Sequence, residues 1–427
     1  MLFWKYGTSD LAKEFSSEVA GDDKTPVAAR PGQPAPEELA DDLEKMGPTF
    51  IKFGQLLSSR PDLLPEPYLK ALARLQDKVK PFPYEQVEEI ISSELGVRIS
   101  KAFSYFEEKH LAAASLGQVH RAALRDGRPV VVKVQRPDIR KQIAEDFEVL
   151  EEIADFFDGH TDLGRRYRFG KILAEFKTSI LQELDYQREA SNLTTLASNL
   201  KEFPHILVPL PVPDFSSRSV LTMDYVSGAK ITTLSPVVKL EINGDVLAEE
   251  LFQAYLKQVL IDGFFHADPH PGNVFLTDDG RIALLDLGMT GRVSSAMQEN
   301  LLRLLLAISE GNGDETVKIV LRISETTDDF DEAEFTKKAT AFVSEQRDQT
   351  LNHQDVGRAL MEVSRTAAQT GLYVPTELTL LGKTLLQLEE VGKILSPKFN
   401  PNASVLPAPV IFSSSVPGIQ KPSLLLP

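Results

Sequence analysis

The chain has 427 residues, with 46 Lys and Arg against 62 Asp and Glu, which gives a formal net charge of −16. Such an acidic balance repels phosphate backbones and argues against nucleic acid as a main partner. Because the chain contains no cysteine, disulfide frameworks, cysteine-based zinc sites, iron–sulfur clusters and thiol nucleophiles are all excluded.

Composition also bounds the class of protein. Apolar residues make up 42% and charged residues 25% of the chain, as in ordinary globular proteins. At roughly 150 residues per domain, the length allows two or three units with cores of their own. No stretch approaches the ~18 uninterrupted apolar residues of a spanning helix, and the first residues lack the apolar core of a signal peptide. We therefore expect a cytoplasmic protein without a transmembrane helix in this chain, and peripheral contact with a membrane stays open.

The N-terminal part is predicted to be a linker followed by helices. Four prolines lie between Gly21 and Pro36, and residues 1–36 are therefore interpreted as an arm and linker. Residues 37–100 carry apolar residues at helical spacing, with Pro48 as a break or kink. The helices expected in this extension run from Glu37 to Ser59, from Pro67 to Val79 and from Tyr84 to Leu95.

Residues 101–228 are predicted to form a small lobe around an antiparallel sheet, with inserted helices. The runs FSYF, GQVHRAAL and RPVVVKVQ have the composition of strands, and Asp126-Gly127 between the last two predicts a hairpin turn. The other elements expected here are helices from Ile139 to Phe157 and from Phe169 to Leu200, and strands around Ile206 to Pro211 and Val220 to Tyr225.

Residues 229–396 are predicted to form a large helical lobe. This lobe contains a hairpin, Asn273 to Leu276 with Ile282 to Leu285, which the turn Asp278-Asp279-Gly280 joins. The last segment, residues 397–427, has seven prolines and no acidic residue. We expect this tail to be disordered or extended, or to belong with a membrane or a partner, and whether it is natural or shortened stays open.

The strongest chemical signal is HADPHPGN, His266 to Asn273, followed by LLDLG, Leu284 to Gly288. Asp268 and Asn273 stand five residues apart, and Asp286 follows 13 residues after Asn273. Phosphoryl transfer needs hard oxygen ligands for Mg²⁺ and one carboxylate near the attacking oxygen. The spacing matches the kinase pattern HRDLxxxN followed by DFG, and it favours that chemistry over plain turn and strand-end chemistry.

Two histidines in this segment, His266 and His270, also stand at a spacing that metal sites use. The two prolines nearby argue against a helix that presents both side chains. A zinc site is therefore the weaker interpretation.

A second signal lies upstream, where AAASLGQV, Ala112 to Val119, precedes the strand VVVK that ends at Lys133. Kinases cover the ATP phosphates with a GxGxxGxV loop, and a lysine on the third strand pairs with phosphate oxygens. Here Ala112 and Ala114 occupy the first two glycine positions, while Gly117 fits the third. An alanine-rich hairpin is common by itself, but its order relative to the strand lysine and the later motif favours a nucleotide loop.

A lysine between apolar strand neighbours should be buried and should need a carboxylate partner. The candidates crowd one segment, QELDYQREASN, where the alternative interpretation is a solvated charged face: Glu183, Asp185 and Glu189. Further along, the segment from Met223 to Gly228 has the form of a nucleotide-binding hinge, in which an extended run ends at a flexible glycine. This pattern is common, and its signal is weakly specific.

Six segments together resemble the UbiB/ADCK-type atypical kinase family (AarF-like, with a KxGQ motif). They are FIKFGQLLSSRPDLLP, AAASLGQVHRA, VVVKVQRP, QELDYQREASN, FFHADPHPGN and LLDLGMTGR, and they follow one another between about Pro48 and Arg292. The resemblance implies an α+β, protein-kinase-like bilobal fold. It has a small antiparallel-sheet lobe, a large helical lobe and an added N-terminal helical KxGQ extension, here Lys52 to Gln55.

The resemblance also implies roles for individual residues. Asp268 would be the catalytic base, and Asn273 and Asp286 would bind Mg²⁺. Lys133 would hold the ATP phosphates and pair with Glu189. The remaining ATP-binding residues would be Ala112, Ala113, Ala114, Ser115, Gly117, Val119, Met223 and Tyr225. Lys52 and Gln55 would lie over the active site as regulatory residues, with Lys52 near Glu183 and Asp185 of an ExD motif.

The function expected from this resemblance is Mg²⁺-dependent ATP hydrolysis or phosphoryl transfer that supports ubiquinone or other prenyl-quinone biosynthesis. One alternative is a kinase that phosphorylates a small molecule, a lipid or a protein. Another is an ATP-gated, non-enzymatic scaffold for quinone-pathway proteins. Beside ATP, the partners that follow are a prenyl-quinone or lipid and quinone-biosynthesis proteins. The absence of an APE motif and of a long activation loop after Asp286 removes the usual docking platform for a protein substrate.

Overall fold

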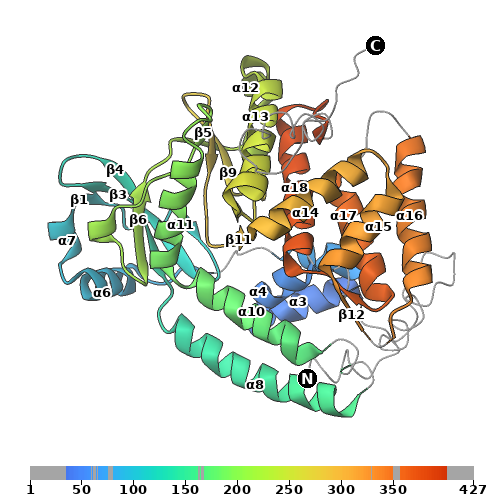
Figure 1. Ribbon diagram of the computed structural model, residues 1–427. Helices are drawn as coiled ribbons and strands as arrows, with labels where there is room; N and C mark the ends of the chain where they lie inside the picture. The colour runs from blue at the N-terminus through green and yellow to red at the C-terminus, as the bar shows by residue number, and fades with distance from the viewer. Residues whose placement is uncertain are drawn as a thin grey trace. The chain divides into compact units, whose positions relative to one another are not determined.

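A computed structural model describes residues 35–401, apart from residues 59, 61–63, 65, 76–79, 162–163, 165–167, 328 and 350–355 (Figure 1). The described residues therefore leave out most of the predicted arm, most of the predicted tail, and the end of the helix expected to reach Val79. The chain divides into two compact units. Unit 1 comprises Met1–Ala190 and Pro211–Tyr225, and unit 2 comprises Ser191–Leu210 and Val226–Pro427.

Unit 1 begins with a helical layer. Its helices are α3 (Pro36–Met46), α4 (Pro48–Ser58), α5 (Glu66–Ala73), α8 (Ile139–His160) and α10 (Phe169–Glu183). The break predicted at Pro48 is present, because Gly47 ends α3 with a φ of 107° that favours glycine. Leu43, Leu72 and Phe147 share one buried core with α10, and α8 and α10 lie side by side (Figure 1).

The sheet of unit 1 is the predicted antiparallel meander. Its strands are β1 (Phe103–Phe106), β2 (Ala112–Ala113), β3 (Gly117–Leu124), β4 (Pro129–Gln135) and β6 (Val220–Asp224), in the order β1-β3-β4-β6 with β2 beside β3. Val130, Val132 and Val134 alternate along β4 and are fully buried. The short helices α6 (Tyr84–Leu95) and α7 (Ile99–Ala102) precede the sheet, and α6 has the predicted bounds.

The single helix predicted from Phe169 to Leu200 is wrong, because the structure has two helices, α10 and α11 (Tyr186–Asn199). The carbonyl of Leu184 accepts hydrogen bonds from the side chains of Gln135 and Arg140 instead of continuing the helical ladder. The Asp185 carboxylate then accepts the backbone N–H of Arg188 at 3.2 Å, as a residue that caps a helix N-terminus does. Tertiary contacts therefore override the periodicity of the sequence at this point.

Unit 2 contains a four-stranded sheet and a separate strand pair. The sheet has the order β5 (Ile206–Leu207), β10 (Ile282–Leu284), β9 (Val274–Thr277) and β7 (Gly228–Lys230), and β8 (Phe264–His266) pairs with β11 (Thr290–Arg292). The predicted hairpin is present as β9 and β10, with Gly280 at a φ of 84° in its turn. Because β5 pairs with β10, residues 191–210 group with unit 2 and not with the small lobe predicted over 101–228.

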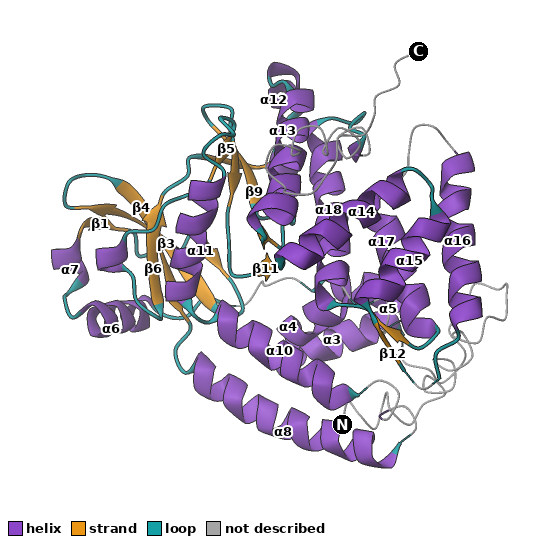
Figure 2. Cartoon of the chain, in the orientation of Figure 1, coloured by secondary structure: helices purple, strands orange, loops and turns teal. Residues whose placement is uncertain are grey.

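Helices make up most of unit 2 (Figure 2). They are α12 (Pro236–Glu241), α13 (Gly244–Lys257), α14 (Ser295–Ser309), α15 (Gly313–Ile323), α16 (Glu332–Gln349), α17 (Val356–Gln369) and α18 (Thr376–Leu395). Two short strands, β12 (Glu325–Thr326) and β13 (Leu372–Tyr373), pair antiparallel among these helices. Phe399 packs against Phe252 and is buried, so the predicted tail starts with packed residues. The α+β class is confirmed. Within the described ranges, no helix is long and apolar enough to span a membrane.

Candidate functional site

The predicted site residues fall into two groups, one in each unit. The nucleotide-loop, strand-lysine and KxGQ residues belong to unit 1, and the HADPHPGN and DLG residues belong to unit 2. Each group is built from contacts within its own unit.

Lys133 and Glu189 form a buried ion pair in unit 1. The Lys133 Nζ atom lies 3.1 Å and 2.9 Å from the two carboxylate oxygens of Glu189. The Glu189 side chain is 1% exposed and that of Lys133 is 17% exposed. The ring of Tyr186, the first residue of α11, lies 5.0 Å from the same ammonium. Since an unpaired charge at this depth is costly, each partner requires the other.

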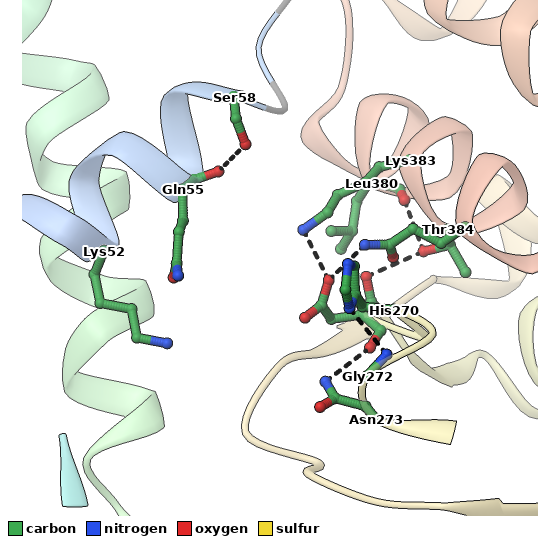
Figure 3. A network of polar contacts seen from close by, with 12 residues as sticks. Lys52, Gln55, Ser58, His270, Gly272, Asn273, Leu380, Lys383 and Thr384 are labelled. Atoms are coloured by element: carbon green, nitrogen blue, oxygen red, sulfur yellow. Dashed lines mark hydrogen bonds and ion pairs between the residues drawn. The ribbon is translucent and has the colours of Figure 1, made fainter. Parts of the chain in front are cut away.

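Lys52 and Gln55 project from the same side of α4 (Figure 3). The Lys52 ammonium lies 2.6 Å from the Glu183 carboxylate at the end of α10, with both side chains less than one fifth exposed. The Gln55 amide donates to the Leu75 carbonyl at 3.1 Å, and the Ser58 hydroxyl donates to the Gln55 carbonyl at 2.7 Å. The KxGQ segment is therefore attached to the ExD motif through Glu183, while Asp185 directly precedes α11 and caps its N-terminus.

The alanine-rich loop forms a tight turn between β2 and β3. The N–H of Ala114 donates to the Gly117 carbonyl at 2.7 Å, and Ser115 is fully buried. A Cβ atom at Gly117 would lie 2.4 Å from the Val134 carbonyl oxygen, so only glycine fits here. Val119 faces Lys133 across the β3–β4 ladder, which places the loop beside the lysine strand.

The proposed hinge residues have their backbone partly occupied. Met223 is 8% exposed and pairs with Val131 in the sheet. The N–H of Tyr225 donates to the Pro129 carbonyl at 3.2 Å, and the Arg121 guanidinium lies 4.5 Å from the Tyr225 ring centre. The Tyr225 N–H would have to leave Pro129 before it could bind an adenine base.

In unit 2, the hairpin brings Asn273 and Asp286 to the same end of the β9–β10 ladder. Asn273 directly precedes β9, and Asp286 is the second residue after β10. The Leu285 N–H donates to the Asn273 carbonyl at 2.9 Å. The Asn273 amide lies 3.4 Å from the Asp268 carbonyl. One carboxylate and one amide oxygen so placed are a donor set that fits Mg²⁺, which completes its shell with phosphate oxygens and waters.

Helix α18 supplies contacts to Asp268 that the sequence did not reveal. The Lys383 ammonium and the Gln387 amide approach the same Asp268 oxygen, Oδ1, at 3.0 Å and 2.8 Å. The Thr384 hydroxyl donates to the Ala267 carbonyl at 3.3 Å (Figure 3). Burial would raise the pKa of the Asp268 carboxyl, but the Lys383 charge and the Gln387 hydrogen bond together lower that pKa below its ordinary value. Asp268 is therefore ionised at neutral pH.

Asp286 adopts a backbone φ of 58°, which is unusual for a residue other than glycine. The Gly288 N–H donates to the Asp286 carboxylate at 3.3 Å. The next carbonyl, that of Leu287, accepts the side-chain amide of Asn192 at 3.1 Å, and both residues are buried. Asn192 stands three residues after Glu189 in REASN, so its place in a charged helical motif was the one available signal.

The two histidines of HADPHPGN, His266 at the end of β8 and His270 in the loop that follows, make separate contacts. The His266 Nδ1 atom lies 2.9 Å from the Tyr255 hydroxyl, and burial lowers the pKa of this imidazole. The His270 Nδ1 atom accepts the Gly272 N–H at 3.0 Å (Figure 3). Both imidazoles thus shape the loop around Asp268.

Comparison with protein families gives two matches. Residues 74–320 match the ABC1 atypical kinase-like domain, and residues 339–400 match the UbiB helical domain. Lys383 and Gln387, which contact Asp268, fall in the second match.

Three curated relatives illustrate the similarity. "Probable protein kinase UbiB" of Marinobacter nauticus is 35% identical over 359 residues, which cover 83% of this chain and 66% of the relative. "Uncharacterized protein slr0889" of Synechocystis is 32% identical over 85% of this chain and 91% of the relative. "Protein ACTIVITY OF BC1 COMPLEX KINASE 7, chloroplastic" of Arabidopsis thaliana is 35% identical over 85% of this chain and 52% of the relative. The chain thus spans between about half and two thirds of the length of several curated relatives.

A solved structure gives a likeness in fold. The structure titled "The complex structure of Rv3197-erythromycin from Mycobacterium tuberculosis" aligns with a TM-score of 0.55 and 22% identity, covering 97% of this chain and 99% of that chain.

Proposed function

Because this chain belongs to the ABC1 atypical kinase (UbiB) family, as its motifs predicted, we propose that it binds ATP with Mg²⁺ and hydrolyses ATP or transfers its phosphoryl group in support of ubiquinone or another prenyl-quinone pathway. The observation that carries this proposal is the buried pair between Lys133 and Glu189. A pair of this type in strand and helix is the arrangement that presents a lysine to ATP phosphates in kinases.

The residues of unit 1 would bind and orient the nucleotide. Lys133, held by Glu189, would contact phosphate oxygens, and the loop from Ala112 to Val119 would cover the phosphates. The backbone of this loop makes a tight turn at Gly117 against β4, which supports a fixed shape. Met223 and Tyr225 would form the hinge, and the Tyr225 N–H would first have to leave the Pro129 carbonyl.

The residues of unit 2 would hold the metal and the attacking group. Asn273 and Asp286 would provide oxygen ligands, and bound Mg²⁺ would neutralise charge on the phosphate oxygens. Asp268 is ionised, and its Oδ1 atom is occupied by Lys383 and Gln387. Lys383 and Gln387 both contact Oδ1, and the other carboxylate oxygen, Oδ2, would orient the attacking hydroxyl or water.

The KxGQ residues would regulate this activity. The Lys52–Glu183 ion pair holds α4 against the last residue of α10. Two residues, Leu184 and Asp185, connect α10 to α11, and Asp185 caps the N-terminus of α11. Glu189 lies on the first turn of α11. A change in the Lys52 pair would therefore reach the partner of Lys133 through two residues of chain and one helical turn.

The proposed function is tested by phosphate release from MgATP by the purified full chain, with and without liposomes and a phenolic quinone-precursor mimic. We expect release that Asp286→Asn abolishes while the fold is kept, and a rise with liposomes would place the protein at membranes as a peripheral enzyme. Transfer of labelled phosphate to a component of a lipid or protein extract would instead identify a kinase. A scaffold would be identified by tight nucleotide binding without turnover, together with unchanged prenyl-quinone content in cells that carry the Asp268→Asn variant.

A further inference from the structure

One arginine binds the backbone of the alanine-rich loop from the side of the sheet. Arg136 follows β4 directly, and its Nε atom donates to the Ser115 carbonyl at 3.2 Å. A terminal guanidinium nitrogen donates to the Ala114 carbonyl at 3.4 Å and to the Lys80 carbonyl at 2.9 Å. The backbone N–H of Arg136 donates to the Leu116 carbonyl at 2.8 Å. Three consecutive carbonyls of the loop therefore turn toward a single residue.

This arrangement determines where the amide hydrogens of the loop point. In a trans peptide the N–H group points opposite to the carbonyl of the preceding residue. When the carbonyls of Ala114 and Ser115 face Arg136, the N–H groups of Ser115 and Leu116 face the other way. Successive N–H groups on one side of a turn form a site that attracts anions such as phosphate.

We infer that Arg136 is a positioning residue for nucleotide phosphates, because it holds the alanine-rich loop with its N–H groups turned away from the sheet. This inference rests on the proposed ATP-binding function. The guanidinium also adds a fixed positive charge behind the loop, which favours a polyphosphate on the opposite side. The Phe82 ring, 5.5 Å from the guanidinium carbon, helps to keep the arginine in place.

The chemistry of arginine suits this role better than that of lysine. The planar guanidinium donates from several nitrogens in fixed directions, whereas a lysine ammonium is a single point on a flexible stem. Only the arginine can reach the carbonyls of Lys80, Ala114 and Ser115 together. We therefore expect Arg136→Lys to restore part of what Arg136→Met loses.

The chain offers a matched control in Arg125. This arginine also donates to backbone carbonyls, those of Lys101 at 3.0 Å and Ser100, but it lies at the β3–β4 turn and away from the loop. Arg125→Met removes the same kind of interaction from the same sheet. A general loss of sheet stability would appear in both variants, and a loss of loop position would appear in Arg136→Met alone.

The inference is tested on the full chain by two measurements. Hydrogen exchange without nucleotide reports the amide of Ala114, which donates to Gly117, and we expect at least tenfold faster exchange in Arg136→Met, with Arg125→Met unchanged. Calorimetric titration with MgATP should give a Kd raised by about tenfold or more in Arg136→Met, from the loss of charge-assisted hydrogen bonds that order the loop. Arg136→Lys should lie between this variant and the wild type.

The outcomes separate this inference from the function on which it rests. A wild type that does not bind MgATP refutes the proposed function. Wild-type exchange at Ala114 in Arg136→Met, or wild-type affinity in that variant, overturns the inference. If Arg136→Met fails to fold, as circular dichroism would show, Arg136→Lys decides, because equal affinity in Arg136→Lys and wild type overturns the role of the planar fork.

Discussion

Replacement of Lys133 by methionine should destabilise unit 1 by far more than the loss of one surface ion pair would. Glu189 is 1% exposed and its carboxylate lies 2.9 Å from the lysine nitrogen. At an effective dielectric constant of about 20, two unit charges at this distance attract by roughly 6 kcal/mol. Without Lys133 the carboxylate stays buried and uncompensated. Breaking such a pair from one side costs about 3–5 kcal/mol, and we expect that loss in Lys133→Met.

A double-mutant cycle tests the reasoning. Urea unfolding followed by circular dichroism would be measured for Lys133→Met, Glu189→Leu and the double variant. We expect the double variant to be more stable than the sum of the single losses predicts, since no charge is then left buried. Lys177→Met is a matched control, because its pair with Glu151 is 41% and 47% exposed and should contribute about 1 kcal/mol or less. A cost below about 1 kcal/mol for Lys133→Met, with additive effects in the cycle, would show that the pair is not buried as described.

Three further predictions concern unit 2 and the sheet of unit 1. Lys383→Met should lower the rate of phosphate release about 10- to 100-fold while the Kd for MgATP stays unchanged, because Asp268 loses a donor that orients it. The control is Lys393→Met, since Lys393 lies on the same helix but pairs with Glu389. A fall in the rate of both variants would contradict the assignment. Asn192→Leu should cost about 1–3 kcal/mol in urea unfolding, because the buried Leu287 carbonyl loses its donor, and equal stability of the variant would argue for another partner. His120 is fully buried and its burial lowers the pKa, so its folded-state pKa lies below the unfolded value of about 6.5. The stability linked to neutral His120 is present above that unfolded value and is lost as the pH falls below it, so the urea midpoint should drop between pH 7.5 and 5.5 and should drop less in His120→Gln.

Two local features of unit 1 could be predicted from the sequence. The expectation that a strand lysine between valines needs a buried carboxylate led to three candidates, and the structure pairs Lys133 with Glu189. The helix from Tyr84 to Leu95 begins after a proline and ends before Gly96, which adopts a φ of 68°, so its bounds could be predicted from local rules. In both cases the determining signal lies within a few residues of the feature.

Contacts between distant segments could not be anticipated in this way. Lys383 and Gln387 stand on a helix whose sequence is ordinary for an amphipathic helix, and they lie 115 and 119 residues from Asp268 along the chain. The break at Leu184 depends on side chains of Gln135 and Arg140, which bind its carbonyl from other elements. Periodicity reports which face of a helix is apolar, but it does not report what the polar face meets.

The interleaving of the two units has a practical consequence for truncation studies. Residues 191–210 belong to unit 2 but are inserted in the sequence of unit 1, so no single cut releases either unit intact. A fragment that starts at Val226 would lack β5, and the edge of β10 at Ile282 and Ala283 would lose its neighbour. It would also lack Asn192, the donor to the Leu287 carbonyl. If such a truncated protein is inactive, the loss of activity would therefore be explained by an unpaired sheet edge that can aggregate. It would not show that a separable nucleotide-binding module has been removed.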